Sequence, residues 1–194
     1  MCEGISLCKN ILFWGKQMDY VVNLVNMFED SDSPYLSVIR ELDGGIIIRR
    51  PHSFEKKNVL YFIANTFRDG WADEVEPAFS HIPCQCLIAT DKDGDVLGFA
   101  SYDVLRRGMF GPIGTRPDMR GSGIGGALLI ECLRGLYNLG FPYGFIGGKN
   151  PNAASFYEHY IGNYSSPIPN SEPGVYRYPM LDKHPDLYKE KLYN

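Results

Sequence analysis

RPDMRGSGIGGALL, residues 116–129, is the densest glycine cluster of the chain and runs directly into an apolar helical pattern. Glycines let a backbone approach a ligand closely, and the first turn of a helix offers unbonded N–H groups at the positive end of the helix dipole. Such a loop suits a pyrophosphate. It equally suits a tight turn that lets the following helix pack closely against a sheet. The loop by itself leaves both interpretations open.

The glycines at 121, 123 and 126 also match G-x-G-x-x-G, the text of a dinucleotide-binding motif. That motif requires the first turn of a β-α-β unit and an acidic residue at the end of the next strand. The next predicted strand, residues 143–148, ends in glycines followed by asparagine and proline, with no Asp or Glu. No lysine follows the glycines, so the loop of nucleoside triphosphatases is absent as well. These departures count against a nicotinamide enzyme.

Strand and helix patterns alternate on both sides of the loop. Residues 84–91 and 96–104 predict a hairpin around the tight turn between them. The predicted fold class is therefore α/β (α+β in some schemes), with one mixed sheet. Further strands are predicted at 46–50, 109–115, 143–148 and 175–181, and helices at 33–42, 53–67, 70–82 (broken at Pro77), 124–139 and 152–161, while residues 19–27 suit either a strand or a short helix.

The spacing Arg120-x-x-Gly123-x-Gly125 resembles the R/Q-x-x-G-x-G/A motif of the GNAT superfamily of acyl-CoA N-acyltransferases. The context is similar to the family's as well, with a strand at 110–115, the lead-in RPDMRG and a long helix afterwards. The resemblance implies that acetyl-CoA is the co-substrate and that no metal is needed.

A second segment, about 30 residues later, resembles the family's N-x-x-A-x-x-F-Y motif, at Asn150, Ala153, Phe156 and Tyr157. The resemblance covers roughly residues 45–180. It implies the GNAT fold, a mixed and mostly antiparallel central sheet of about six to seven strands, splayed at the cofactor cleft and flanked by helices. We expect a GNAT acetyltransferase domain at 45–194 and, at 1–44, an N-terminal extension that packs on it.

The resemblance also implies a binding site for coenzyme A. Backbone amides from Arg120 to Gly126 would bind its pyrophosphate, and backbone groups of Ile113 and Thr115 would meet the pantetheine arm and the thioester carbonyl. Strands 110–115 and 143–147 would part to admit that arm. The implied cofactor-binding residues are Ile113, Gly114, Thr115, Arg120, Gly121, Ser122, Gly123, Ile124, Gly125, Gly126, Asn150, Ala153 and Phe156.

Tyr157 is the implied catalytic residue, a general acid that protonates the departing thiolate. Packing of Tyr157 in the core beside Phe156 is the alternative. The general base is not evident, because the strand at 109–115 carries no Asp, Glu or His. The open candidates are Asp103, Glu74, Glu76, His81 or a bound water, and Trp71 and Phe79 either line the acceptor pocket or belong to the core.

Composition narrows the class of partners. The chain has 194 residues, enough for one domain with a core, and a net charge of −4 without a basic stripe, so we expect no nucleic acid. No apolar stretch approaches the length of a membrane span, so we expect a cytoplasmic protein that binds no membrane. The expected activity is N-acetyltransferase, acting on an amine acceptor that the sequence does not identify. A homodimer is the oligomer considered. A non-catalytic acyl-CoA-binding sensor with the same fold is the alternative.

Overall fold

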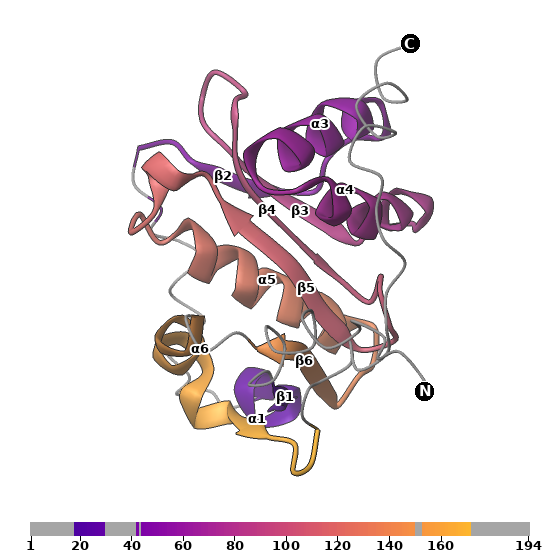
Figure 1. The fold of residues 1–194 in the computed structure, drawn as a ribbon, viewed down its shortest axis with the longest axis vertical. Helices are drawn as coiled ribbons and strands as arrows, with labels where there is room; N and C mark the ends of the chain where they lie inside the picture. The colour runs from indigo at the N-terminus through magenta and orange to yellow at the C-terminus, as the bar shows by residue number, and fades with distance from the viewer. Residues whose placement is uncertain (1–17, 30–41, 43, 150–152, 172–194) are drawn as a thin grey trace, which may run out of the picture.

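The computed structural model describes residues 18–29, 42, 44–149 and 153–171, which form a seven-stranded sheet with helices on both faces (Figure 1). The strand order is β2-β3-β4-β5-β6-β1-β7. Strands β5 and β6 are parallel, and every other neighbouring pair is antiparallel. The predicted fold class is thus confirmed. The strands are β1 (Met18–Asn23), β2 (Ile47–Arg49), β3 (Cys86–Thr90), β4 (Val96–Tyr102), β5 (Met109–Thr115), β6 (Tyr143–Lys149) and β7 (Ser165–Pro167).

The helices follow the apolar periodicity of the sequence closely. The helix predicted at 124–139 is α5, and it ends just before Gly140, whose φ of +88° favours glycine. The helix predicted to break at Pro77 stops at Val75 and continues as a 3₁₀ turn, Glu76–Ser80. No helix in the described ranges is long and apolar enough to cross a bilayer. The α-helices are α1 (Leu24–Glu29), α3 (Lys56–Thr66), α4 (Asp69–Val75), α5 (Ile124–Asn138) and α6 (Ala154–Ile161).

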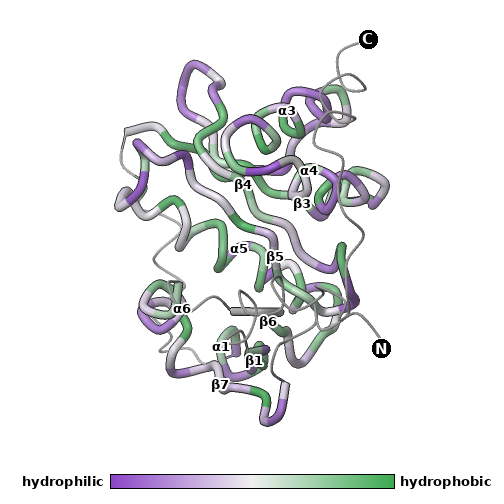
Figure 2. The backbone as a smooth tube through the Cα atoms, viewed as in Figure 1, coloured by the Kyte–Doolittle hydropathy of each residue, from purple (hydrophilic) through white to green (hydrophobic). Residues whose placement is uncertain are grey.

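Each face of the sheet has its own hydrophobic core. Helix α5, largely green in Figure 2, is the centre of one core and buries Leu128, Leu129 and Leu133 completely. Helices α3 and α4 form the other core with Ile88 and Phe99 of the sheet. Because both faces are covered, all five residues of β3 are buried, which explains its continuous apolar run.

Strand β1 comes from the N-terminal part of the chain and lies between β6 and β7. Residues 19–27, which suited either a strand or a helix, form both in succession, β1 and then α1. Helix α1 buries Leu24 and Met27 in the core around α5. The predicted boundary between 44 and 45 stays a prediction. The strand predicted at 175–181, and nearly all of the helix predicted at 33–42, lie outside the described residues.

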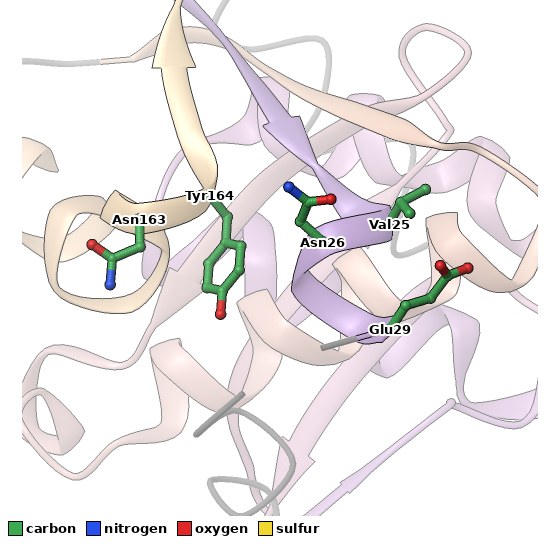
Figure 3. Close-up of a pocket in the computed structure, with 5 residues that line it drawn as sticks. All are labelled: Val25, Asn26, Glu29, Asn163 and Tyr164. Carbon is green, nitrogen blue, oxygen red and sulfur yellow. The ribbon is translucent and has the colours of Figure 1, made fainter. Parts of the chain in front are cut away.

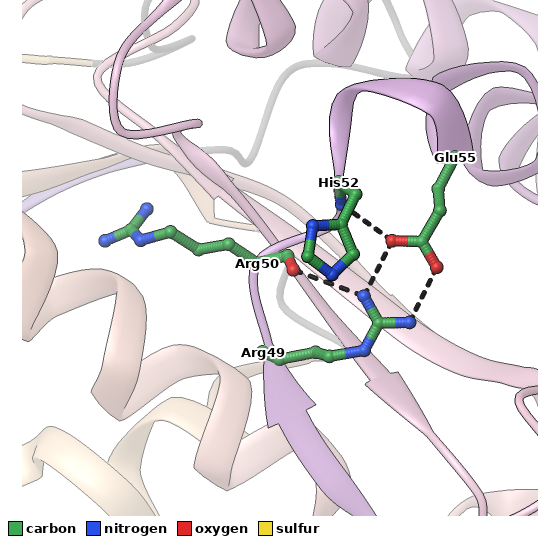
Figure 4. A network of polar contacts seen from close by, with 4 residues as sticks. All are labelled: Arg49, Arg50, His52 and Glu55. Carbon is green, nitrogen blue, oxygen red and sulfur yellow. Dashed lines mark hydrogen bonds and ion pairs between the residues drawn. The ribbon is translucent and has the colours of Figure 1, made fainter.

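A charged network joins the end of β2 to the start of α3 (Figure 4). The two terminal nitrogens of Arg49 each donate to one carboxylate oxygen of Glu55, both at 2.7 Å. The N–H of His52 donates to the same carboxylate at 2.6 Å. The Arg49 guanidinium, helped by that N–H, lowers the pKa of Glu55 to about 2.

The first prediction concerns this ion pair. The pKa of Glu55 is lower in the folded protein than the 4.5 of a free side chain, so its stabilisation is present above pH 4.5 and is lost as the pH falls toward 2. The shift corresponds to about 3 kcal/mol, which solvent screening of these partly exposed side chains reduces to about 1–2 kcal/mol. Glu55→Gln should therefore lose about 1–2 kcal/mol of unfolding free energy at pH 7 and less than half as much near pH 3, measured by urea denaturation.

A matched control for this prediction is Glu76→Gln. Glu76 pairs with Lys56 at 3.0 Å, but its side chain is 52% exposed. We expect a loss below about 0.5 kcal/mol at both pH values. An equal stability difference between wild type and Glu55→Gln at pH 7 and pH 3 would contradict the electrostatic account.

Candidate active site

The central feature of the candidate site is the place where β5 and β6 stop pairing. These parallel strands pair only at Met109 with Phe145 and at Phe110 with Ile146. No further pair joins them among the described residues, although β5 continues to Thr115 and β6 to Lys149. The C-terminal half of β5 therefore has a partner on one side only, strand β4. We call the unpaired side of β5 the gap.

The hydrogen bonds of β5 show which of its residues face the gap. Backbone groups of successive residues in a strand point alternately to its two sides. The N–H of Arg116 donates to the Leu97 carbonyl of β4 at 2.8 Å, so Gly114, two residues earlier, also points to β4. The backbone N–H and C=O of Ile113 and Thr115 consequently point to the gap. These are the two residues whose backbone the family resemblance assigned to the pantetheine arm and thioester.

A β-bulge sets this orientation. The ladder pairs Tyr102 with Phe110 and then Ala100 with Ile113, so two residues of β5, Gly111 and Pro112, lie opposite one residue of β4. Without the extra residue, Pro112 and Gly114 would face the gap, and proline has no N–H to offer. The bulge thus supplies the gap with the N–H of Ile113.

The glycine loop lies between β5 and α5. Gly121 and Gly123 have φ of +85° and +84°, a conformation that other residues rarely adopt. The first backbone bond of α5 runs from the N–H of Ala127 to the Gly123 carbonyl. Within the described part of the chain, none of the backbone N–H groups of residues 121–126 donates a hydrogen bond. Six donors without a partner among the described residues suit an anion, and the exposed side chain of Arg120 stands directly before them.

The last two glycines of the loop serve packing instead. A Cβ atom on Gly125 would lie 3.2 Å from the ring of Phe156, and one on Gly126 would lie 2.2 Å from the ring of Tyr160. Both rings belong to α6, the helix of the second motif. The two interpretations of the loop therefore apply to different glycines: Gly121 and Gly123 shape the turn, while Gly125 and Gly126 let α5 contact α6.

Tyr157 is buried beside the point where β5 and β6 part. Its side chain is 8% exposed, and its ring packs edge-on against Phe156 and against Phe110, the last residue of β5 that pairs with β6. Burial raises the pKa of Tyr157 to about 12. Ala153 directly precedes α6 and packs on the same core, whereas Asn150 lies outside the described residues.

Among the candidate bases, Asp103 has a structural role. Asp103 is fully engaged at the turn between β4 and β5, where its carboxylate accepts the Gly108 N–H at 2.7 Å and pairs with Arg107 at 2.8 Å. The carboxylate of Asp103 therefore holds this turn. Trp71 and Phe79 pack on the core of α3 and α4.

Phe67 is a residue that sequence reasoning missed. Its ring covers Gly114 on the face of the sheet opposite α5, where a Cβ on that glycine would lie 2.6 Å away. A glycine inside a strand is a signal of such close approach. The Phe67 ring therefore fills the space where a side chain at position 114 would stand.

A hollow of about 370 Å³ lies elsewhere, between α1 and the segment after α6 (Figure 3). The hollow is lined by Val25, Asn26, Glu29, Asn163 and Tyr164. It contains none of the predicted site residues.

Within the described ranges, no three His, Cys, Asp or Glu side chains gather as a metal site requires. The prediction that no metal is needed stays a prediction.

Comparison with known proteins agrees with this architecture. The model of the acetyltransferase (GNAT) family matches residues 56–162, more than half of the chain, and includes the glycine loop and Tyr157. The chain belongs to the GNAT family of acetyltransferases. This confirms the family that the two sequence motifs indicated. No curated protein matches the sequence.

Solved structures share the fold at low sequence identity. The GCN5-related glucosamine N-acetyltransferase region of a fungal multi-domain GH3 β-N-acetylglucosaminidase superposes with a TM-score of 0.59 at 14% identity, over 78% of this chain and 20% of that one. A GCN5-related N-acetyltransferase from Sphaerobacter thermophilus gives 0.57 at 19% identity, over 78% of this chain and 48% of that one. The chain thus spans between a fifth and a half of these structures, and the likeness concerns the fold alone.

Proposed function

We propose that this protein is an N-acetyltransferase that moves the acetyl group of acetyl-CoA to a primary amine of a small molecule or peptide by direct attack. The observation that carries the proposal is a path of backbone donors without partners in the described structure, in two segments that residues 116–120 separate. The path begins at the N–H groups of residues 121–126 and continues with those of Thr115 and Ile113 along the gap. It ends beside Phe110, which contacts Tyr157.

Each part of this path suits one part of the co-substrate. The N–H groups of the loop, with Arg120, bind the two negatively charged phosphates at the start of α5. The backbone of Thr115 and Ile113 replaces the missing pairing with β6 by hydrogen bonds to the amide-containing pantetheine arm. The N–H of Ile113 donates to the thioester oxygen, and this bond strengthens as negative charge develops there.

Tyr157 completes the reaction at the sulfur. The amine nitrogen bonds to the thioester carbon, the carbon–sulfur bond breaks, and the sulfur leaves with the electron pair and takes a proton from the Tyr157 hydroxyl. Burial raises the pKa of Tyr157, and it also raises the pKa of thiols, as at Cys86 and Cys132, so a desolvated departing thiolate is a stronger base than one in water and accepts the proton more readily. A bound water takes the proton of the amine, and solvent restores the one on Tyr157.

The second prediction is a pH profile without an alkaline limb near pH 10. Because its pKa is about 12, Tyr157 keeps its proton through pH 10.5. Turnover should rise with pH as the amine substrate loses its own proton and should not fall before pH 10.5, measured as kcat between pH 6 and 10.5. A fall with an apparent pKa near 10, the ordinary value for tyrosine, would contradict the buried placement of this acid.

One observation favours a second candidate, a non-catalytic acyl-CoA-binding module. Strand β5 has no Asp, Glu or His, and Asp103 is engaged in its turn, so no carboxylate of these two elements is ready to act as a base. In such a module the path of donors would hold acyl-CoA for signalling or for contact with a partner. The protein would then bind acetyl-CoA without consuming it.

A panel of amines, assayed with acetyl-CoA and a free-thiol readout, tests both candidates. Amino sugars, antibiotics, small amine metabolites and peptide N-termini form the panel. The enzyme predicts thiol release that depends on one class of amine. Tight binding of acetyl-CoA without thiol release for any class would favour the binding module. We further propose a cytoplasmic protein that binds neither nucleic acid nor membrane, with a homodimer as the assembly to test.

A further inference from the structure

A buried serine of β4 holds the bulge of β5. Ser101 is completely buried, and its hydroxyl donates a 2.8 Å hydrogen bond to the carbonyl of Gly111. Gly111 and Pro112 are the two residues that lie opposite Ser101. A buried carbonyl at a bulge lies outside the regular ladder and needs another donor. The hydroxyl of Ser101 is that donor.

The contact lies on the face of the sheet away from α5. Residues of β4 alternate between the two faces, and Ala100 and Tyr102 belong to the core around α5, while Phe99 belongs to the core of α3 and α4. Ser101 shares the face of Phe99. It therefore holds Gly111 from the face of the sheet opposite α5, the helix that begins at the glycine loop.

We propose that Ser101 is a positioning residue for acyl transfer. By holding the Gly111 carbonyl, Ser101 fixes the bulge, and the bulge is what turns the N–H of Ile113 toward the gap and thus toward the thioester oxygen. The inference rests on the proposed function. It predicts that Ser101 affects the reacting carbonyl and leaves the binding of the phosphates unchanged.

The test uses Ser101→Ala and acetyl-CoA labelled with ¹³C at the thioester carbonyl. In wild type, difference infrared spectroscopy should show the bound carbonyl band at a lower frequency than in free acetyl-CoA, because an N–H donates to it. In Ser101→Ala at least half of that shift should be lost. With an active amine, kcat should fall about 10- to 100-fold, while the Kd for CoA, which has no thioester, stays within about twofold.

Ser171→Ala is the matched control. Its buried hydroxyl accepts the N–H of Asp19 at 2.9 Å, a bond of similar length that lies at β1, away from the bulge. This variant should keep the wild-type carbonyl band and kcat. Should Ser101→Ala fail to fold, Ser101→Cys, whose thiol is a weaker donor, takes its place and should give an intermediate band.

Three outcomes overturn the inference. The first is a carbonyl band at the same frequency in wild type and in the folded Ser101 variant, which would show that the serine does not position the donor. A loss of CoA affinity in proportion to kcat shows a general structural role. Failure of wild type to bind either CoA or acetyl-CoA removes the proposed function, and this inference falls with it, whereas normal binding with coinciding bands removes the inference alone.

Discussion

Turnover of the Tyr157→Phe variant is expected to fall by about 10²- to 10⁴-fold, the usual contribution of a general acid. Phenylalanine preserves the edge-on ring contacts with Phe110 and Phe156 but has no proton for the departing sulfur. The Kd for acetyl-CoA should stay within about threefold of wild type, because Tyr157 serves the breaking bond rather than the phosphates. Steady-state kinetics with an active amine and calorimetric titration of acetyl-CoA measure the two quantities.

Tyr137→Phe is the control for this variant. Tyr137 lies near the C-terminal end of α5 and belongs to neither motif. Its hydroxyl donates to Glu29 of α1 at 2.9 Å, and its loss should leave kcat unchanged. Wild-type turnover in Tyr157→Phe would show that the tyrosine is a core residue and nothing more.

Gly126→Ala should both destabilise the protein and weaken acyl-CoA binding. Its new methyl group would lie 2.2 Å from the ring of Tyr160, so this ring, or helix α6 with it, must move away from α5. Overpacking of this kind costs about 1–3 kcal/mol of unfolding free energy. Because Gly126 stands in the first turn of α5, the movement also displaces the N–H groups of the loop. We expect the Kd for acetyl-CoA to rise at least about tenfold, measured by calorimetry alongside urea denaturation.

Gly135→Ala separates the two effects. Gly135 lies in the same helix and makes an equally close contact, since a Cβ there would lie 2.4 Å from the ring of Tyr102. It should lose a similar stability and keep the wild-type Kd. If Gly126→Ala bound acetyl-CoA as tightly as wild type, α6 would not support the loop as described.

Much of the fold could be predicted from local sequence. Strand β3, within the run predicted at 84–91, and the start of α5 at Ile124 follow directly from apolar patterns, because both elements are central and buried. The family could be predicted because its motif combines residues for backbone shape, such as Gly123, with residues for charge, such as Arg120. Local signals of this kind need no knowledge of the tertiary structure.

Features that depend on distant residues could not be predicted. Strand β1 lies beside β6, more than 100 residues away in sequence, and nothing in its own residues indicates that partner. The short β7, Ser-Ser-Pro, carries no strand signal and is ordered by pairing with β1. The bulge at Gly111 and its hydrogen bond from Ser101 also require the register between two strands. The same holds for the contact between Gly126 and Tyr160, which joins the two motifs.

The central claim is that the backbone of the loop and of the gap binds coenzyme A. Backbone amide NMR during a titration with CoA tests it most directly, with NADH as the comparison ligand. The account predicts that the amide signals of Ile113, Thr115 and residues 121–126 shift with CoA, that the signal of Gly140, beyond the opposite end of α5 from the loop, does not, and that NADH leaves all of them in place. Unchanged signals at Ile113 and Thr115 with saturating CoA, or equal shifts with NADH, would contradict it.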